Sequence, residues 1–318
     1  MITEKLKIEN LLKSGISTLT MYRINHLGKR LYCTATPFKV YSGLTGALSS
    51  ATFKGNIDAK RISKWRDKMI EHLGGQDTQE AYLNTMADFG TILHECLVKI
   101  KEKGKLNWEE EQDYAYAYFD ASARAKGINP NEGVTRAQVF EYCKSAAALL
   151  QFFHDNVIEV YSIEGMAKSD KLQIATPIDI TCLIKDKKKD FIATLNLKTS
   201  SQIGDHQREQ CAVEKYLWNE TYPDCQAAKT GIIRAKDWSL KKGIPTYELE
   251  FLNEEKEAEM LKDATARLLL IKDNPSSTYL NYSSESLIFE GETLLGGKPS
   301  LTAKTIEQLF NETHETAE

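Results

Sequence analysis

Two polar residues close an otherwise apolar run near the middle of the chain. The segment "ATLNLKTSSQ" covers residues 193–202 and carries Asn196 and Lys198. Side chains alternate between the two sides of a strand, so these two residues share one side. A carboxylate followed two positions later by lysine would suggest a metal-dependent phosphodiesterase. The neutral amide of Asn196 makes that interpretation harder.

A carboxylate interrupts the apolar segment that comes before. Asp179 lies in "ATPIDITCLI" (175–184), and the polar run "KDKKKD" after it is a good hairpin connection. Antiparallel pairing through that turn would bring Asp179 close to Asn196 and Lys198. Oxygen ligands of this kind hold Mg²⁺ or Mn²⁺ against a phosphate, while a lysine orients water or stabilises developing charge. For Asp179 and Lys198 taken alone, a buried salt bridge is an equal alternative.

The elements that must position these residues change type near residue 157. Apolar residues at helical spacing predict a mainly helical first half, with one extended segment at 29–36 and helices at about 58–73, 78–103, 108–126 and 135–156. β-branched and apolar runs then predict strands at 157–167, 172–185, 190–200, 227–235 and 246–252, with helices at 206–219 and 254–272. The expected fold class is α/β (α+β), with a mixed central sheet flanked by helices and a helical N-terminal half. We divide the chain into a helical part (1–156), a core (157–290) and a peripheral tail (291–318).

Composition limits the classes of protein that fit. A chain of 318 residues with 42% hydrophobic residues can bury a sizeable core, and its net charge of −4 means that a nucleic-acid site must be a local basic surface. The six cysteines show no Cys-x-x-Cys pair, which argues against a zinc knuckle or a redox motif and fits a reducing compartment. No signal-peptide core or membrane-spanning run is evident, so we expect a cytoplasmic protein without a membrane partner.

Motifs in order along the chain resemble the PD-(D/E)xK nuclease superfamily, in particular the RecB-like exonuclease branch that includes the mitochondrial genome-maintenance exonuclease. The family pattern is a helix with Gly-x-x-x-His, an acidic residue ahead of a Gly-x-x-Asp strand, an Asp/Glu-x-Lys strand and a helix with a glutamine motif. The matching positions, over about residues 60–235, are Gly90 and His94, Glu164, Asp179, Asn196 and Lys198, and Gln207 and Gln210.

The resemblance implies a restriction-endonuclease-like core and a role for each matching residue. Asp179, Asn196, His94 and Glu164 would hold Mg²⁺ or Mn²⁺, Lys198 would be the catalytic lysine, and Gln210 would brace that lysine or the attacking water. No cysteine follows Cys225, so we expect no iron–sulfur cluster. We expect DNA to contact a basic and polar set, namely Lys60, Arg61, Lys64, Thr199, Ser200, Arg208, Arg234 and Lys236.

Three departures from the family pattern stand out. Thr176 replaces the usual glycine, Glu214 stands where the family has a tyrosine, and Asn196 removes an anion from the site. Asn196 has three explanations: an inactive homologue, a natural site compensated by Glu164 and His94, or an Asp→Asn change introduced to trap a substrate complex. Of these we favour the introduced change.

The leading functional hypothesis is a metal-dependent DNA exonuclease that acts on DNA ends, in recombination, repair or genome processing of a bacterium or phage. It would work on single-stranded or end-bearing DNA, with a recombination or replication protein as a possible partner. The alternative is a catalytically inactive DNA-binding protein with a nuclease fold, which Asn196 favours. A third, weaker option is an interaction protein whose strand motif is coincidental.

Overall fold

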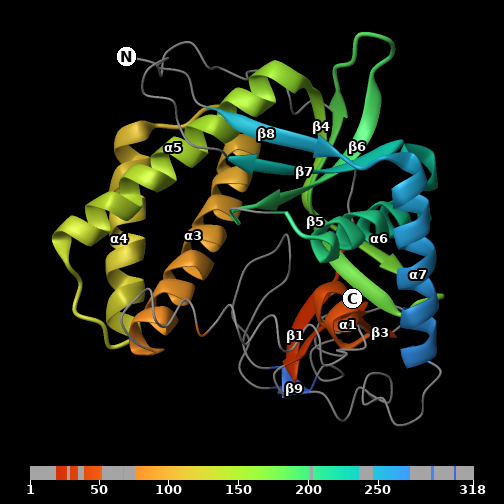
Figure 1. The fold of residues 1–318 in the computed structure, drawn as a ribbon, viewed down its shortest axis with the longest axis horizontal. Helices are drawn as coiled ribbons and strands as arrows, with labels where there is room; N and C mark the ends of the chain where they lie inside the picture. The colour runs from red at the N-terminus through yellow and green to blue at the C-terminus, as the bar shows by residue number, and fades with distance from the viewer. Residues whose placement is uncertain are drawn as a thin grey trace, which may run out of the picture.

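The structure is a computed structural model that describes residues 19–26, 29–34, 39–51, 67, 76–200, 203–235, 246–272, 288–289 and 304–305. In this part of the chain a mixed sheet runs through the middle of the molecule, and helices cover it from both sides (Figure 1). No helix among the described residues is both long and apolar enough to cross a membrane. All six cysteines are free.

The sheet has eight strands, in the order β1-β2-β3-β5-β6-β7-β8 with β4 paired to β5. Their bounds are β1 Tyr22–His26, β2 Lys29–Thr34, β3 Lys39–Gly43, β4 Val157–Ser169, β5 Ile174–Ile184, β6 Phe191–Lys198, β7 Lys229–Ala235 and β8 Tyr247–Phe251. Strand β3 is parallel to β5 and β6 is parallel to β7, whereas the other pairs are antiparallel. The predicted mixed sheet is therefore confirmed.

Strand β5 is the centre of this sheet because it pairs on both edges. Strand β4 follows one edge from Ile174 to Ile184. On the other edge, β3 pairs with residues 174–175 and β6 pairs with residues 180–184. Among the described strands, none pairs with residues 176–179 on that second edge. Asp179 is the last residue of this unpaired stretch.

Helices form the outer layers: α1 Leu44–Ala51, α3 Gln76–Lys103, α4 Trp108–Ala125, α5 Glu132–Asn156, α6 Asp205–Thr221 and α7 Glu254–Lys272, with a 3₁₀ turn at Pro223–Cys225. Asparagine side chains cap two of them, since Asn107 accepts from the Glu109 N–H and Asn131 from the Val134 N–H. Helices α3, α4 and α5 share one apolar core with β4, β5 and β6, whereas α1, α6 and α7 share a second.

The predicted helices and strands from residue 78 onward are confirmed to within a few residues. The expectation of a mainly helical first half is wrong in one respect, because β1 and β3 join the predicted extended segment β2 to form three strands. These strands are five or six residues long, and β3 joins the central sheet only through β5, more than a hundred residues later. Such short segments carry little local periodicity, so their partners decide their structure.

Two predicted segments lie largely or wholly outside the described residues. The helix predicted at 58–73 is described only at Asp67. The tail predicted at 291–318 is described only at β10, Lys304–Thr305, which pairs with β9, Ile288–Phe289.

Candidate metal centre

Three polar residues lie level with one another on neighbouring strands. The antiparallel registers of β4 with β5 and of β5 with β6 place Glu164, Asp179 and Asn196 in one row across the sheet. Pairing of β5 with β6 ends at Ile180 and Leu195, one position before the row. Beyond that point the Asp179 carboxylate accepts the backbone N–H of residue 197 at 2.6 Å. The Asp179 side chain thus takes the place of backbone pairing between β5 and β6 where the row begins.

His94 adds a nitrogen ligand from α3. Its Nδ1 lies 2.8 Å from Oε1 of Glu164 and 3.6 Å from Oδ1 of Asp179. One ligand atom from each of His94, Glu164 and Asp179 lies within 4.8 Å of the others, which is close enough for one cation to reach all three. The neighbours Leu93 and Leu97 are fully buried and fix the helix against the core. The structure therefore brings together three of the four predicted metal ligands.

The backbone at Glu164 is strained. Its φ is 53°, in the left-handed region that residues other than glycine rarely adopt. Such a conformation costs on the order of 1–3 kcal/mol and persists only where the surroundings impose it. In this chain the imposed conformation coincides with a carboxylate that faces a histidine and a second carboxylate.

The electrostatics of the cluster show how strongly its members depend on one another. Burial raises the pKa of Asp179, Glu164 raises it further, and His94 opposes both. Burial lowers the pKa of His94, but Asp179 and Glu164 outweigh it and bring the pKa to about 9. The cluster therefore favours a positive charge between its two carboxylates. A cation bound there would replace the proton on His94, because only neutral imidazole ligates metal.

A second polar chain begins at Lys198 and ends at Asn196. Lys198 Nζ donates to Oε1 of Gln210 on α6 at 3.4 Å, and Gln210 Nε2 donates to Oε1 of Glu214 at 2.7 Å. Asn196 Nδ2 lies 3.0 Å from each carboxylate oxygen of Glu214. The expected contact between Lys198 and Gln210 is thus present, and their catalytic roles remain predictions.

Glu214 is the member of this network that the sequence did not assign to the site. It is 1% exposed, and burial, followed by the charge of Asp179, raises its pKa. Its position on α6 gave two signals: it follows Gln210 by one helical turn, and it is an acid between Val213 and Leu217, which are both buried. A carboxylate inside an apolar helix face needs partners, and the partners are the predicted site residues.

The predicted DNA contacts fall into three groups. Thr199 and Ser200 are exposed at the end of β6. Arg208 and Arg234 form ion pairs with acids: Arg208 lies 2.7 Å from Glu250 and 3.1 Å from Asp205, and Arg234 pairs with Glu248. Four residues lie outside the described part of the chain, namely Lys60, Arg61, Lys64 and Lys236. DNA contact by all of these residues remains a prediction.

Gly90 shows how α3 passes the end of β6. A Cβ built on Gly90 would lie 3.9 Å from the Thr199 hydroxyl oxygen, an ordinary van der Waals distance. Helix α3 therefore approaches β6 one turn before His94. The space at Gly90 does not itself require glycine.

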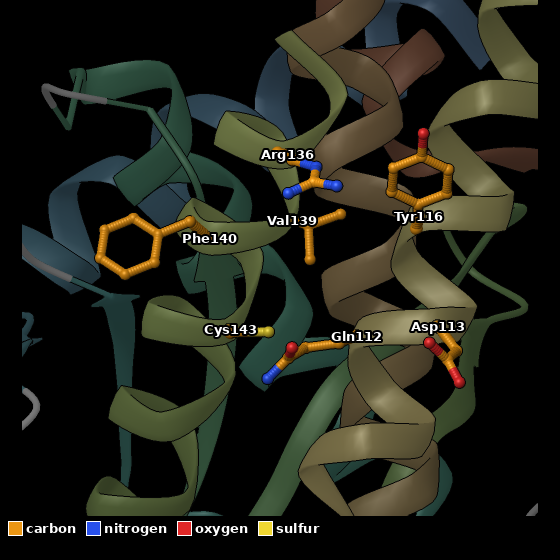
Figure 2. Close-up of a pocket in the computed structure, with 7 residues that line it drawn as sticks. All are labelled: Gln112, Asp113, Tyr116, Arg136, Val139, Phe140 and Cys143. Atoms are coloured by element: carbon orange, nitrogen blue, oxygen red, sulfur yellow. The ribbon is translucent and has the colours of Figure 1, made fainter. Parts of the chain in front are cut away.

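A hollow lies between α4 and α5, and it holds none of the predicted site residues. Figure 2 shows the residues that line it: Gln112, Asp113 and Tyr116 come from α4, and Arg136, Val139, Phe140 and Cys143 come from α5. Its lining carries no cluster of carboxylates and histidines. We therefore place the candidate chemistry at the strand row and not in this hollow.

No family model matches the chain, and no curated protein matches its sequence.

Proposed function

We propose that the protein is a metal-dependent deoxyribonuclease of the PD-(D/E)xK type that degrades DNA from its ends. The observation that supports this most is the convergence of His94, Glu164 and Asp179 beside a strand that carries Lys198. The order of these residues along the chain matches the family pattern. The preference for ends comes from the resemblance alone.

The donor set fits a hard divalent cation. Two carboxylates and one imidazole offer oxygen and nitrogen ligands, and the imidazole tilts preference towards Mn²⁺ over Mg²⁺. Asn196 adds an amide oxygen, Oδ1, which is buried and has no hydrogen-bond partner within the part of the chain that the structure describes. A bound cation would supply charge neutralisation at the scissile phosphate and would lower the pKa of a coordinated water.

Lys198 is the candidate catalytic lysine. Hydrolysis adds water across one P–O bond: the water oxygen bonds to phosphorus and loses its proton, while the departing oxygen gains one. A lysine held near that phosphate stabilises the charge that develops on its oxygens, or orients the water. The Gln210 carbonyl accepts from the Lys198 ammonium and so limits the positions that it can take.

The second candidate function is DNA binding without catalysis, and Asn196 is the observation that favours it. A neutral amide in place of the family's carboxylate lowers the charge available to a cation. In that case the fold would bind DNA and leave it intact.

The test is a cleavage assay on the 318-residue chain with its sequence unchanged. The substrates are end-labelled single-stranded DNA, blunt duplex DNA and a covalently closed circle of the same sequence, each with Mn²⁺, Mg²⁺ or EDTA. We expect the linear substrates to be degraded with metal and the circle to survive. Asp179→Asn should abolish the activity, and Asp186→Asn, an exposed aspartate in the β5–β6 turn, is the matched control.

Each result separates the candidates. Cleavage of the closed circle would contradict the exonuclease proposal and would indicate an endonuclease. Intact DNA under all conditions, together with measurable DNA binding, would favour the inactive binding protein. Neither cleavage nor binding would leave only the interaction protein.

A further inference from the structure

Asn196 and Glu214 form a buried pair with a defined direction. Both Glu214 oxygens lie 3.0 Å from Asn196 Nδ2, and the two side chains are 2% and 1% exposed. The amide nitrogen faces both carboxylate oxygens, so Asn196 is the donor of this pair and Glu214 is the acceptor. The amide oxygen is then directed elsewhere.

That oxygen is unusual. Oδ1 of Asn196 is a buried side-chain acceptor with no hydrogen-bond partner among the described residues. Buried polar atoms are nearly always paired, and an exception calls for an explanation. An amide oxygen is a good ligand for Mg²⁺ or Mn²⁺, and Asn196 lies level with Asp179 on the neighbouring strand.

We propose that Glu214 supplies, from α6, the negative charge that residue 196 lacks, and that it orients Asn196 so that Oδ1 becomes a neutral ligand of the metal site. Asn196 and Glu214 are then a matched pair native to this chain, and Asn196 is not an inactivated aspartate. This inference rests on the proposed function, since it concerns the same metal site.

The surroundings of Glu214 suit an asparagine at position 196 and not an aspartate. An aspartate there would place two carboxylates in contact, both cut off from water, and like charges at that distance repel strongly. Gln210 donates one hydrogen bond to Glu214, and its own oxygen is directed to Lys198. No other side-chain donor to Glu214 is evident among the described residues. Asn196 provides the donor that the carboxylate needs.

Glu214 acts here as a positioning residue, because it touches Asn196 and Gln210 and through them the ligand row and Lys198. The site keeps the number of negative charges of an Asp-x-Lys strand, with one charge moved from the strand to the helix.

The test compares four proteins of 318 residues: the unchanged chain, Asn196→Asp, Glu214→Gln and the double variant Asn196→Asp/Glu214→Gln. Mn²⁺ binding without DNA is measured by calorimetry, and thermal unfolding is measured without metal. We expect Glu214→Gln to weaken Mn²⁺ binding by about tenfold or more, as loss of a residue that orients a metal ligand does. Asn196→Asp alone should lower the unfolding temperature. The double variant exchanges donor and acceptor, so it should bind Mn²⁺ within a few fold of the native protein.

Glu111→Gln is the matched control, since Glu111 is another buried glutamate, bonded to Tyr142 and Lys99 within the helical layer. It should lower the unfolding temperature and leave Mn²⁺ affinity unchanged. Two results would overturn the inference: tighter Mn²⁺ binding by Asn196→Asp with an unchanged unfolding temperature, or a double variant that binds no better than Glu214→Gln. If the expected binding pattern appears but the native protein cleaves no DNA, the proposed hydrolysis fails and the inference stands.

Discussion

The two sides of β6, a strand of eight residues, differ in polarity: one side is apolar and the other is polar. On one side, Leu195 and Leu197 are buried in the apolar core shared with α3 and α5. On the other side, Thr194, Asn196 and Lys198 each bond to polar groups on α6 or β7. One strand therefore carries both the stability of the sheet and the candidate chemistry, on separate faces. Changes on the two sides should be separable by experiment.

The difference shows where the strand's conformation comes from. The apolar side fixes the position of β6 by hydrophobic burial, which is not directional. The polar side needs particular partners, because each buried donor or acceptor must meet its complement. The polar side therefore depends on its partners on α6 and β7, whereas burial alone holds the apolar side in place.

The largest effect should come from the polar side, at Lys198. In the proposed mechanism Lys198 stabilises the negative charge that develops on phosphate, so we expect Lys198→Ala to lower cleavage by about 10³-fold or more. DNA affinity should stay within a few fold and stability should hardly change, because Lys198 is only partly buried. Single-turnover cleavage and DNA titration measure the two quantities. The control is Lys188→Ala, which lies in the exposed turn before β6. Equal loss of cleavage and binding would make Lys198 a phosphate clamp only.

The next largest effect should come from the apolar side, at Leu195. Leu195→Ala leaves a cavity in a fully buried position, which costs about 2–5 kcal/mol of unfolding free energy. Urea denaturation measures that loss. Cleavage per folded molecule should stay near the native value, because the polar row is supported by its own hydrogen bonds. A loss of activity that exceeds the loss of folded protein would mean that the two sides are coupled.

Much of this arrangement was legible in the sequence because the signals were local. Helical spacing predicted α3, α4 and α5, and the polar turn after β5 predicted the hairpin that brings Asp179 beside β6. Strands β1 and β3 were missed because their pairing partners, and not their own periodicity, define them. The role of Glu214 was missed for a similar reason: it depends on a contact between α6 and β6 that no single segment encodes.

The polar side should also make the stability of the metal-free protein depend on pH, with an effect of intermediate size. In the metal-free folded protein Asp179 and Glu214 have raised pKa values, so they hold protons at a pH where the unfolded chain has released them. A cation bound at the site would favour the charged form of both carboxylates. Folding without metal then binds protons, and stability falls as pH rises from the ordinary carboxyl range towards neutrality. His94 acts in the same direction: its contribution is complete below its unfolded pKa of about 6.5 and is lost as pH rises through about 9.

We therefore expect the unfolding temperature of the metal-free protein to drop by several degrees between pH 5 and pH 9 because of these groups. Mn²⁺ should restore most of the loss at the higher pH, since it replaces the proton charge. Differential scanning calorimetry of the native protein and of His94→Gln measures both parts. The same slope in both proteins would show that His94 does not contribute.

The smallest effect should come from Thr194, which shares the polar side of β6 but lies away from the ligand row. The Thr194 hydroxyl donates to the Thr230 hydroxyl at 3.0 Å. The Thr230 hydroxyl in turn has two backbone oxygens within donating distance, those of residues 194 and 211. Thr194→Val keeps the shape and removes one donor, so we expect a loss of about 1 kcal/mol in unfolding free energy. Cleavage and Mn²⁺ affinity should be unchanged. A fall in Mn²⁺ affinity would instead mean that the polar side of β6 acts as one network from Thr194 to Lys198. The candidate site would then extend along the whole strand and would not end at the row of Glu164, Asp179 and Asn196.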